Sequence, residues 1–371
     1  MRNLYPTILQ IVIFGCFLIL SSCSGSSDET DIGEKDDGIL RITADKTEIL
    51  ADGVEKVTFT VRLGTKDVSD KNTMNLILVR ESGEEEKLDY GVHAFSTQVS
   101  GTYTFKASYY EGESMLTENE IMVVAKSVSG GVDYYHKILG MQFTSVGCQA
   151  CPTLSSALKA IQAEWPERLT VASFHMDFEM KDPMSIKATN TYRTNIFGNF
   201  TGLPRFFYNL RKGTEMISIK SQIEKELQKE LRDYPASCGV AINSTYDPST
   251  RMVSITAKLT SNVTNTYRCL IYLVEDNIGY FQTNGGDNYI HNNVVRTVVS
   301  TSLNGDRFES EVQARREVTM SRSSQLAEGW NADNMRIIVA MLNTLDGGKT
   351  YTCNNLNECK LGESVDYLYN E

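Results

Sequence analysis

The amino-acid sequence predicts a multidomain protein in which a central α/β domain lies between two all-β domains. Three observations favour this arrangement. A Cys-x-x-Cys motif, Cys148 to Cys151, follows an apolar run and opens an amphipathic one. Apolar and polar residues alternate with period two before this region, over residues 39–126, and again after Pro235. Such alternation is typical of half-buried strands, whereas apolar residues three and four positions apart are typical of an amphipathic helix.

The Cys-x-x-Cys motif is the centre of the predicted α/β domain. Residues 137–143 are almost all apolar and predict a buried strand. After the motif, apolar residues share one helical face: Leu154, Leu158, Ile161 and Trp165. Pro152 suits the first turn of that helix, which has no intrahelical N–H bond to lose. A helix N-terminus also stabilises a thiolate, so strand, motif and helix follow in the order of a thioredoxin-type redox site.

The two cysteines allow three interpretations besides a redox dithiol. Half of a zinc site would need a second pair of ligands, and the histidines are scattered along the chain: His93, His136, His175 and His291. The cysteines could also form a static disulfide, or be buried without any relation to each other. We take the redox dithiol as the prediction, with Cys148 as the attacking thiolate and Cys151 as the resolving thiol.

Pro204 is the third predicted catalytic residue. It follows Gly202-Leu203 and precedes an apolar strand segment, which is the setting of a cis-proline at the start of a strand. The alternative is an ordinary trans proline at a strand edge. A cis bond beside the dithiol would leave backbone groups free to pair with an extended substrate.

The remaining elements complete a thioredoxin-like domain over residues 132–235. They are a strand at 169–174 that leads to His175 and Asp177, a helix from Asp182 to Gly198, a strand from Pro204 to Leu210, and a helix to Tyr234. Asp182 is expected to cap its helix, with Pro183 in the first position. His175 is expected to be a surface histidine at the end of its strand; the alternative is a proton-transfer role for His175 and Asp177 if that strand ends near the dithiol.

One position departs from the thioredoxin pattern in a way that matters for chemistry. Thioredoxins keep a buried carboxylate about six positions before the first cysteine, where this chain has Gln142. An amide cannot accept the proton of the second thiol. Gly147 also stands where thioredoxins have tryptophan. Thiol–disulfide exchange itself requires only a thiolate, so the dithiol prediction stands but efficient turnover is not expected.

The first 38 residues are predicted to be a lipoprotein signal and a tether. Residues 1–22 combine Arg2 with an apolar run that is short for a membrane span, and the run ends in Leu20-Ser21-Ser22-Cys23. This ending resembles a bacterial lipobox, in which Cys23 is acylated and binds membrane lipid; an ordinary secretory signal is the alternative. Residues 23–38 carry six acids and one lysine and are expected to be a solvated tether.

Charge and cysteine content restrict the partners. The net charge of −11 argues against a nucleic-acid partner. No cofactor is expected. Six cysteines remain in the body of an exported chain once Cys16 and Cys23 are set aside. Besides the motif these are Cys238, Cys269, Cys353 and Cys359, and their pairing stays open, with a weak preference for Cys353 with Cys359 because they are nearest.

The two flanking regions are predicted to be β-sandwiches. Residues 39–126 resemble bacterial immunoglobulin-like repeats, and we expect a spacer or, alternatively, a binding module. Residues 236–367 form the second. The loop that carries Tyr280, Phe281, Tyr289 and His291 is expected to be a structured connection rather than a binding loop.

Taken together, these motifs resemble one family. The lipobox ending at Cys23, Cys148-Gln-Ala-Cys151-Pro152, Gly202-Leu-Pro204 and the stretch from Val274 to Arg296 are similar to the outer-membrane-protein-twenty-eight family of Bacteroidetes lipoproteins. The resemblance implies a lipid-anchored outer-membrane protein, facing the periplasm or the cell surface. Two functions remain open: thiol–disulfide exchange on envelope or surface protein clients, and non-catalytic surface binding or adhesion.

Overall fold

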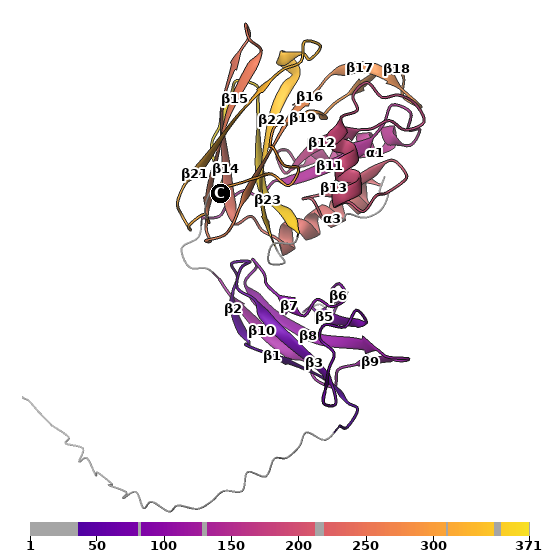
Figure 1. The fold of residues 1–371 in the computed structure, drawn as a ribbon, viewed down its shortest axis with the longest axis vertical. Helices are drawn as coiled ribbons and strands as arrows, with labels where there is room; N and C mark the ends of the chain where they lie inside the picture. The colour runs from indigo at the N-terminus through magenta and orange to yellow at the C-terminus, as the bar shows by residue number, and fades with distance from the viewer. Residues whose placement is uncertain are drawn as a thin grey trace, which may run out of the picture.

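The computed structural model describes residues 36–80, 83–127, 132–211, 219–308, 311–344 and 350–370. Two bodies are visible in it: a smaller one built from strands β1 to β10, and a larger one that holds every later element (Figure 1). No helix within the described ranges is long and apolar enough to cross a bilayer. The predicted signal, Cys23 and most of the tether lie outside the described residues.

Two sheets form the smaller body. One has the order β1-β3-β4 with β7 paired to β3, and the other has the order β2-β10-β8-β5-β6 with β9 paired to β8. Alternate residues of β3, Val57, Phe59 and Val61, point into one core between the sheets, as the period-two pattern predicts. The strands are β1 (Leu40–Ala44), β2 (Glu48–Leu50), β3 (Val57–Leu63), β4 (Lys66–Asp67), β5 (Met74–Val79), β6 (Glu85–Lys87), β7 (Ala94–Phe95), β8 (Gly101–Tyr110), β9 (Ser114–Leu116) and β10 (Ile121–Lys126).

The larger body is mostly strand, with three short α-helices among its described residues. Its helices are α1 (Cys151–Glu164), α2 (Lys187–Thr191) and α3 (Lys220–Asp233), with a π-helical turn (Tyr192–Ile196) after α2 and a 3₁₀ turn (Ala332–Asn334) before β22. Its strands are β11 (Ile138–Thr144), β12 (Leu169–His175), β13 (Arg205–Tyr208), β14 (Cys238–Asp247), β15 (Met252–Ser261), β16 (Arg268–Glu275), β17 (Ile278–Gln282), β18 (Gly286–His291), β19 (Val294–Val298), β20 (Asp306–Arg307), β21 (Val318–Gln325), β22 (Met335–Thr344), β23 (Tyr351–Lys360) and β24 (Ser364–Val365).

One sheet runs through the whole larger body, and it overturns the predicted fold class. Its order is β13-β11-β12-β19-β16-β22-β23, with β20 paired to β16. The first three strands, expected to belong to a separate thioredoxin-like α/β domain, continue into strands expected to belong to a separate C-terminal sandwich. The join is the edge of β12, where Ser173 pairs in parallel with Val294 of β19 and its N–H donates to the Asn293 carbonyl at 2.7 Å. The prediction of a central thioredoxin-like domain between two sandwiches is therefore wrong, because the edge that would bound such a domain is occupied.

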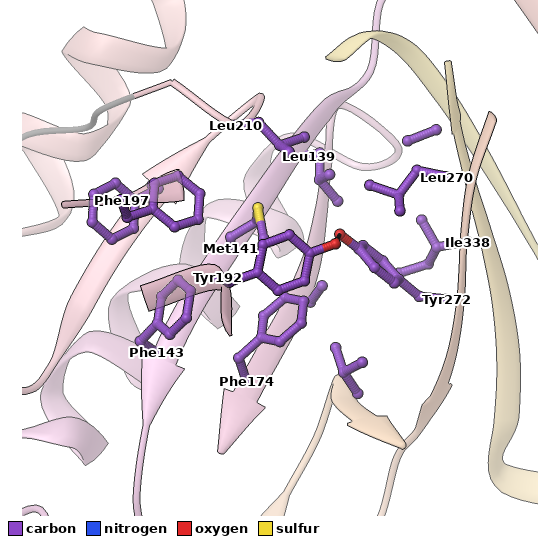
Figure 2. Packing of buried hydrophobic residues seen from close by; sticks show 14 of the residues in the cluster. Leu139, Met141, Phe143, Phe174, Tyr192, Phe197, Leu210, Leu270, Tyr272 and Ile338 are labelled. Carbon is purple, nitrogen blue, oxygen red and sulfur yellow. Dashed lines mark hydrogen bonds between the residues drawn. The ribbon is translucent and has the colours of Figure 1, made fainter. Parts of the chain in front are cut away.

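A shared hydrophobic core also joins the two parts of this sheet. On one face of the sheet, Met141 and Phe174 from the first strands meet Tyr272 and Ile338 from the later ones (Figure 2). The hydroxyls of Tyr192 and Tyr272 are 2.7 Å apart across this core. Apolar burial on this scale holds both halves in one cooperative unit, because separating them would expose large aromatic side chains to water.

The opposite face of the same sheet is covered in two different ways. Helices α1 and α3 cover the β13-β11-β12 end, where Leu158 and Ile161 pack with Ile223 and Leu227. The four-stranded sheet β21-β15-β14-β24 covers the other end and encloses a second core with β16 and β22. The change of cover from helix to sheet matches the change of sequence period that the chain shows after Pro235.

The helix expected from Asp182 begins later than predicted. The structure has α2 only from Lys187, followed by the π-helical turn to Ile196. Asp182 does not cap a helix: its carboxylate accepts from the N–H groups of Val146 and Met184 and from His175. Instead of capping a helix, the carboxylate bonds to its near neighbour Met184, to His175 of β12 and to Val146 of the loop after β11.

The weakly preferred Cys353–Cys359 disulfide is not formed. Cys238, Cys269, Cys353 and Cys359 are all free and buried. Cys353 and Cys359 lie on the same strand, β23, and six residues of extended chain span about 20 Å, far beyond the reach of a disulfide. The two side chains also belong to different cores.

Candidate functional site

Cys148 and Cys151 form a disulfide at the start of α1. The sulfur atoms are 2.06 Å apart, Cys151 is the first residue of the helix, and Pro152 follows it in the first turn. Ala150 at the N-cap supplies no side-chain hydrogen bond, so no side-chain cap occupies the N–H groups of this turn. The N–H groups of Cys151 and Thr153 donate to the Cys148 and Ala150 carbonyls at 3.4 and 3.2 Å, and Pro152 has no N–H. A thiolate released by reduction would therefore be stabilised by the positive end of the helix dipole.

The disulfide is covered rather than open to solvent. Cys148 is 2% exposed and Cys151 is 1% exposed. The adjoining Gly147 lies against residues 178–180: a Cβ atom placed on it would be 2.3 Å from the Phe178 carbonyl oxygen and 2.9 Å from the Met180 Cγ. We call residues 178–180 the strap. Met180 itself is 43% exposed, so the strap separates the loop before the disulfide from solvent.

A hairpin from much later in the chain holds the loop that carries Cys148. This hairpin, β17–β18, sends the Gln282 side-chain amide to the carbonyl oxygens of Ser145 and Cys148, at 3.2 and 2.9 Å. The Thr283 N–H donates to the Val146 carbonyl at 2.8 Å, and the Asn284 amide reaches the Gln149 carbonyl at 3.4 Å. The hairpin thus fixes the backbone of residues 145–149, which we call the cysteine loop.

A buried acid–histidine pair supports the same loop from another side. Asp182 accepts the backbone N–H of Val146 at 2.9 Å, and the Nδ1–H of His175 donates to the same carboxylate oxygen at 2.8 Å. Burial raises the pKa of Asp182, but the His175 hydrogen bond, its charge and the backbone N–H donors outweigh it, so the pKa lies below its usual value. His175 is 2% exposed, so the expectation of a surface histidine is wrong.

His291 lies beside this pair, with its ring centre 5.3 Å from that of His175. Burial and the neighbouring His175 lower the pKa of His291 to about 4, so the ring is neutral at pH 7. The ring centre of Tyr289 lies 4.8 Å from that of His291. The two histidines, expected to be scattered, are brought together, yet among the described residues no three His, Cys, Asp or Glu side chains are placed to hold a metal ion.

Pro204 follows a cis peptide bond, as the sequence predicts. Leu203 is buried in the same hydrophobic cluster as Cys148 and Cys151. Strand β13 begins at the next residue, where Arg205 pairs with Phe143 of β11, the strand that leads into the cysteine loop. Pro204 therefore lies at the end of the sheet where the disulfide lies.

Gln142, on β11, makes hydrogen bonds that support the structure. Its side chain accepts from the Ser173 hydroxyl at 3.1 Å and donates to the Ser155 hydroxyl at 2.8 Å. Ser155 in turn donates to the Cys151 carbonyl at 3.2 Å. This chain of neutral groups ties the sheet to the first turn of α1 and offers no carboxylate to the thiols.

The disulfide and the cis-proline follow from sequence motifs, but their supports do not. Nothing local marks Gln282 or Asp182 as partners of the cysteine loop, because both bonds join residues far apart in the chain. The sequence feature that could point to the hairpin is the concentration of polar and aromatic residues over 280–291. By itself it indicates only a structured connection.

The later part of the chain matches a family model. The model described as "Outer membrane protein Omp28" matches residues 190–365, which include the hairpin that holds the cysteine loop. Residues 190–365 are therefore similar to the Omp28 outer membrane protein family. The protein is thus an outer membrane protein, and the resemblance inferred from the sequence motifs is confirmed over this range. The model match does not extend to Cys148 and Cys151.

Two solved structures resemble part of this chain. HBP35 of Porphyromonas gingivalis is 18% identical, with a TM-score of 0.53, and the match covers 62% of this chain and 77% of that one. Protein AGR_C_4864 from Agrobacterium tumefaciens is 14% identical, with a TM-score of 0.43, covering 62% of this chain and 96% of that one. Among curated proteins, none matches the sequence of this chain.

Proposed function

We propose that this outer membrane protein carries out thiol–disulfide exchange with proteins of the cell envelope through Cys148 and Cys151. The observation that carries the proposal is the Cys-x-x-Cys disulfide at the uncapped start of α1, at the same sheet end as cis-Pro204. A helix start favours the thiolate, and the short spacing lets the second thiol resolve a mixed disulfide quickly.

The exchange balances without any further reactant. In the reduced protein, the Cys148 thiolate attacks a client disulfide, forms a mixed disulfide and releases one client thiolate. The Cys151 thiolate then attacks the Cys148 sulfur, which restores the protein disulfide and releases the second client thiolate. Two electrons pass from protein to client, the two thiolates of the client take up the protons lost by the two cysteines, and the reverse sequence oxidises a client dithiol.

Strand β13 would hold the client chain beside the disulfide. It is the terminal strand of the eight-stranded sheet, paired on one side with β11, and no described strand pairs with its other edge. An extended peptide can add to such an edge through main-chain hydrogen bonds. The residues that bury the disulfide must move before the client reaches Cys148, because both cysteines are almost fully buried.

Trapping tests the proposal. With Cys151→Ala, the resolving step is lost, so mixed disulfides with envelope proteins should accumulate and disappear under reductant. The control is Cys148→Ala in the same Cys151→Ala background, which should give none. As a second measurement independent of these variants, the wild-type protein titrated in glutathione buffers should show one two-electron couple. A disulfide that resists reduction in the folded protein, together with no adducts, would contradict the proposal.

Non-catalytic surface binding is the second candidate. The observation that favours it is the burial of both sulfur atoms, 2% and 1% exposed as residues, which suits a static disulfide that braces the cysteine loop. A negative trapping result with a disulfide that persists in reducing buffer would select this function.

The lipid anchor is part of the same proposal. Leu20-Ser21-Ser22-Cys23 and the acidic residues after it support acylation of Cys23 and attachment to the outer membrane, with the body held off the lipid by the tether. Envelope or surface proteins are then the clients within reach.

A further inference from the structure

A cavity of about 590 Å³ lies where the smaller body meets the end of α3. Residues from β5 to β8 form most of its wall, and Arg232, Asp233 and Tyr234 close it from the side of the larger body. Figure 1 shows α3 at this boundary, next to the N-terminal strands. The cavity shares no residue with the cysteine loop, so it is separate from the proposed redox site.

The inner wall is apolar and aromatic. Leu78, Leu88, Val92 and Phe95 line it, and the Phe95 ring lies 4.9 Å from the ring of Tyr103. The Tyr103 hydroxyl donates a hydrogen bond to the Val99 carbonyl at 2.8 Å. This wall therefore offers contact area to an apolar body and few free polar groups.

The rim carries an excess of positive charge. Arg80 lies between two carboxylates, at 2.6 Å from Glu86 and 3.0 Å from Asp233. Each carboxylate also has a second cation: Lys229 at 3.1 Å from Glu86, and Arg232 at 2.8 Å from Asp233. Both acids are thus fully neutralised.

Lys56 adds a further charge to this rim. It lines the cavity, is half-buried, and makes no ion pair or hydrogen bond with any side chain in the described part of the chain. A positive cavity in a chain of net charge −11 is unexpected for a general solvated surface and suits an anionic ligand.

We propose that this cavity binds a small amphipathic organic anion, a carboxylate or sulfonate with an apolar body. The apolar body would lie against Phe95 and Leu78, and the anionic group would pair with Lys56 at the rim. The volume is in the range of small-molecule sites, which often lie between domains. Because Arg80 joins Glu86 of one body to Asp233 of the other, the ligand would also contact both bodies.

Fluorescence of 8-anilinonaphthalene-1-sulfonate, an aromatic sulfonate, provides the test on the chain from residue 24 to 371. We expect saturable binding at one site and displacement by decanoate. Lys56→Gln should weaken binding about tenfold, the effect of losing one charge-assisted contact. Lys159→Gln, at an exposed lysine on α1 outside the cavity, should leave it unchanged. Val92→Trp should abolish binding by filling the cavity, and Val92 is 38% exposed, so the fold should tolerate the larger ring.

Two results would overturn the proposal. Equal binding to wild type, Lys56→Gln and Val92→Trp would place the probe elsewhere. Equal affinity for the uncharged analogue N-phenyl-1-naphthylamine would show that the cavity does not recognise the anion. Neither result depends on the cysteines, so the redox proposal is tested separately.

Discussion

At the scale of single residues, the candidate site depends on what is missing at position 147. Gly147 is buried, and the Phe178 carbonyl and Met180 lie so close to it that they leave no room for a Cβ atom. The thioredoxin pattern would have a tryptophan here. The absence of any side chain lets the strap pack directly against the cysteine loop, next to Cys148, which is 2% exposed.

Gly147→Ala should therefore displace the strap. We expect a loss of about 1–3 kcal/mol in the free energy of unfolding, typical of overpacking, and faster reduction of the Cys148–Cys151 disulfide by dithiothreitol. The matched control is Gly202→Ala, since a Cβ at Gly202 would meet only the Arg205 side chain, at 3.9 Å. Reduction rates that are the same in wild type and both variants would show that the strap does not limit access.

At the scale of elements, the β17–β18 hairpin positions the cysteine loop although it is over 130 residues away in sequence. Gln282 is 2% exposed and its amide bridges two carbonyl groups of that loop. Asn284, on the same hairpin, reaches the loop through one longer bond near the surface. Gln282 is therefore a buried support of the cysteine loop, and Asn284 is an exposed one.

Gln282→Ala should loosen the loop and destabilise the protein. Losing two buried hydrogen bonds costs about 1–3 kcal/mol, and amide exchange at residues 145–149 should accelerate. Asn284→Ala, the control, should change stability by less than about 0.5 kcal/mol. Unaltered exchange in Gln282→Ala would mean that the loop is held by α1 and Asp182 without the hairpin.

At the scale of the whole molecule, one sheet joins the disulfide region to the part that matches the Omp28 family model. The family places the protein in the outer membrane. No described helix crosses a membrane, and we propose that attachment comes from acylation of Cys23.

Cys23→Ala should release the protein from the membrane fraction. Each buried CH₂ of an acyl chain contributes about 0.8 kcal/mol, so removing the chains removes the anchor. Cell fractionation and immunoblotting measure the change. Cys16→Ala, within the predicted signal, should leave the protein in the membrane. A Cys23→Ala protein that fractionates with wild type would exclude the lipid anchor.

Local pattern was enough to place the elements that depend on near neighbours. The strand at 138–144, the helix after Cys151, the strand at 169–175 and the helix to Asp233 lie within a residue or two of where periodicity and Pro152 predict them. The disulfide and cis-Pro204 also follow from short motifs. In each case the deciding factor is an interaction between residues a few positions apart or the burial pattern of a single element.

Tertiary structure alone decided how those elements combine. Nothing in the sequence of β12 shows that Ser173 pairs with Val294, yet this contact joins two expected domains into one sheet. Asp182 has the sequence context of a helix cap, but its carboxylate bonds to His175 and Val146 instead. A sheet edge pairs with whichever strand the fold brings beside it, and the strand beside β12 is more than a hundred positions away in sequence. A carboxylate likewise bonds to whichever donors the fold brings close, and for Asp182 these include a loop that folds back against it.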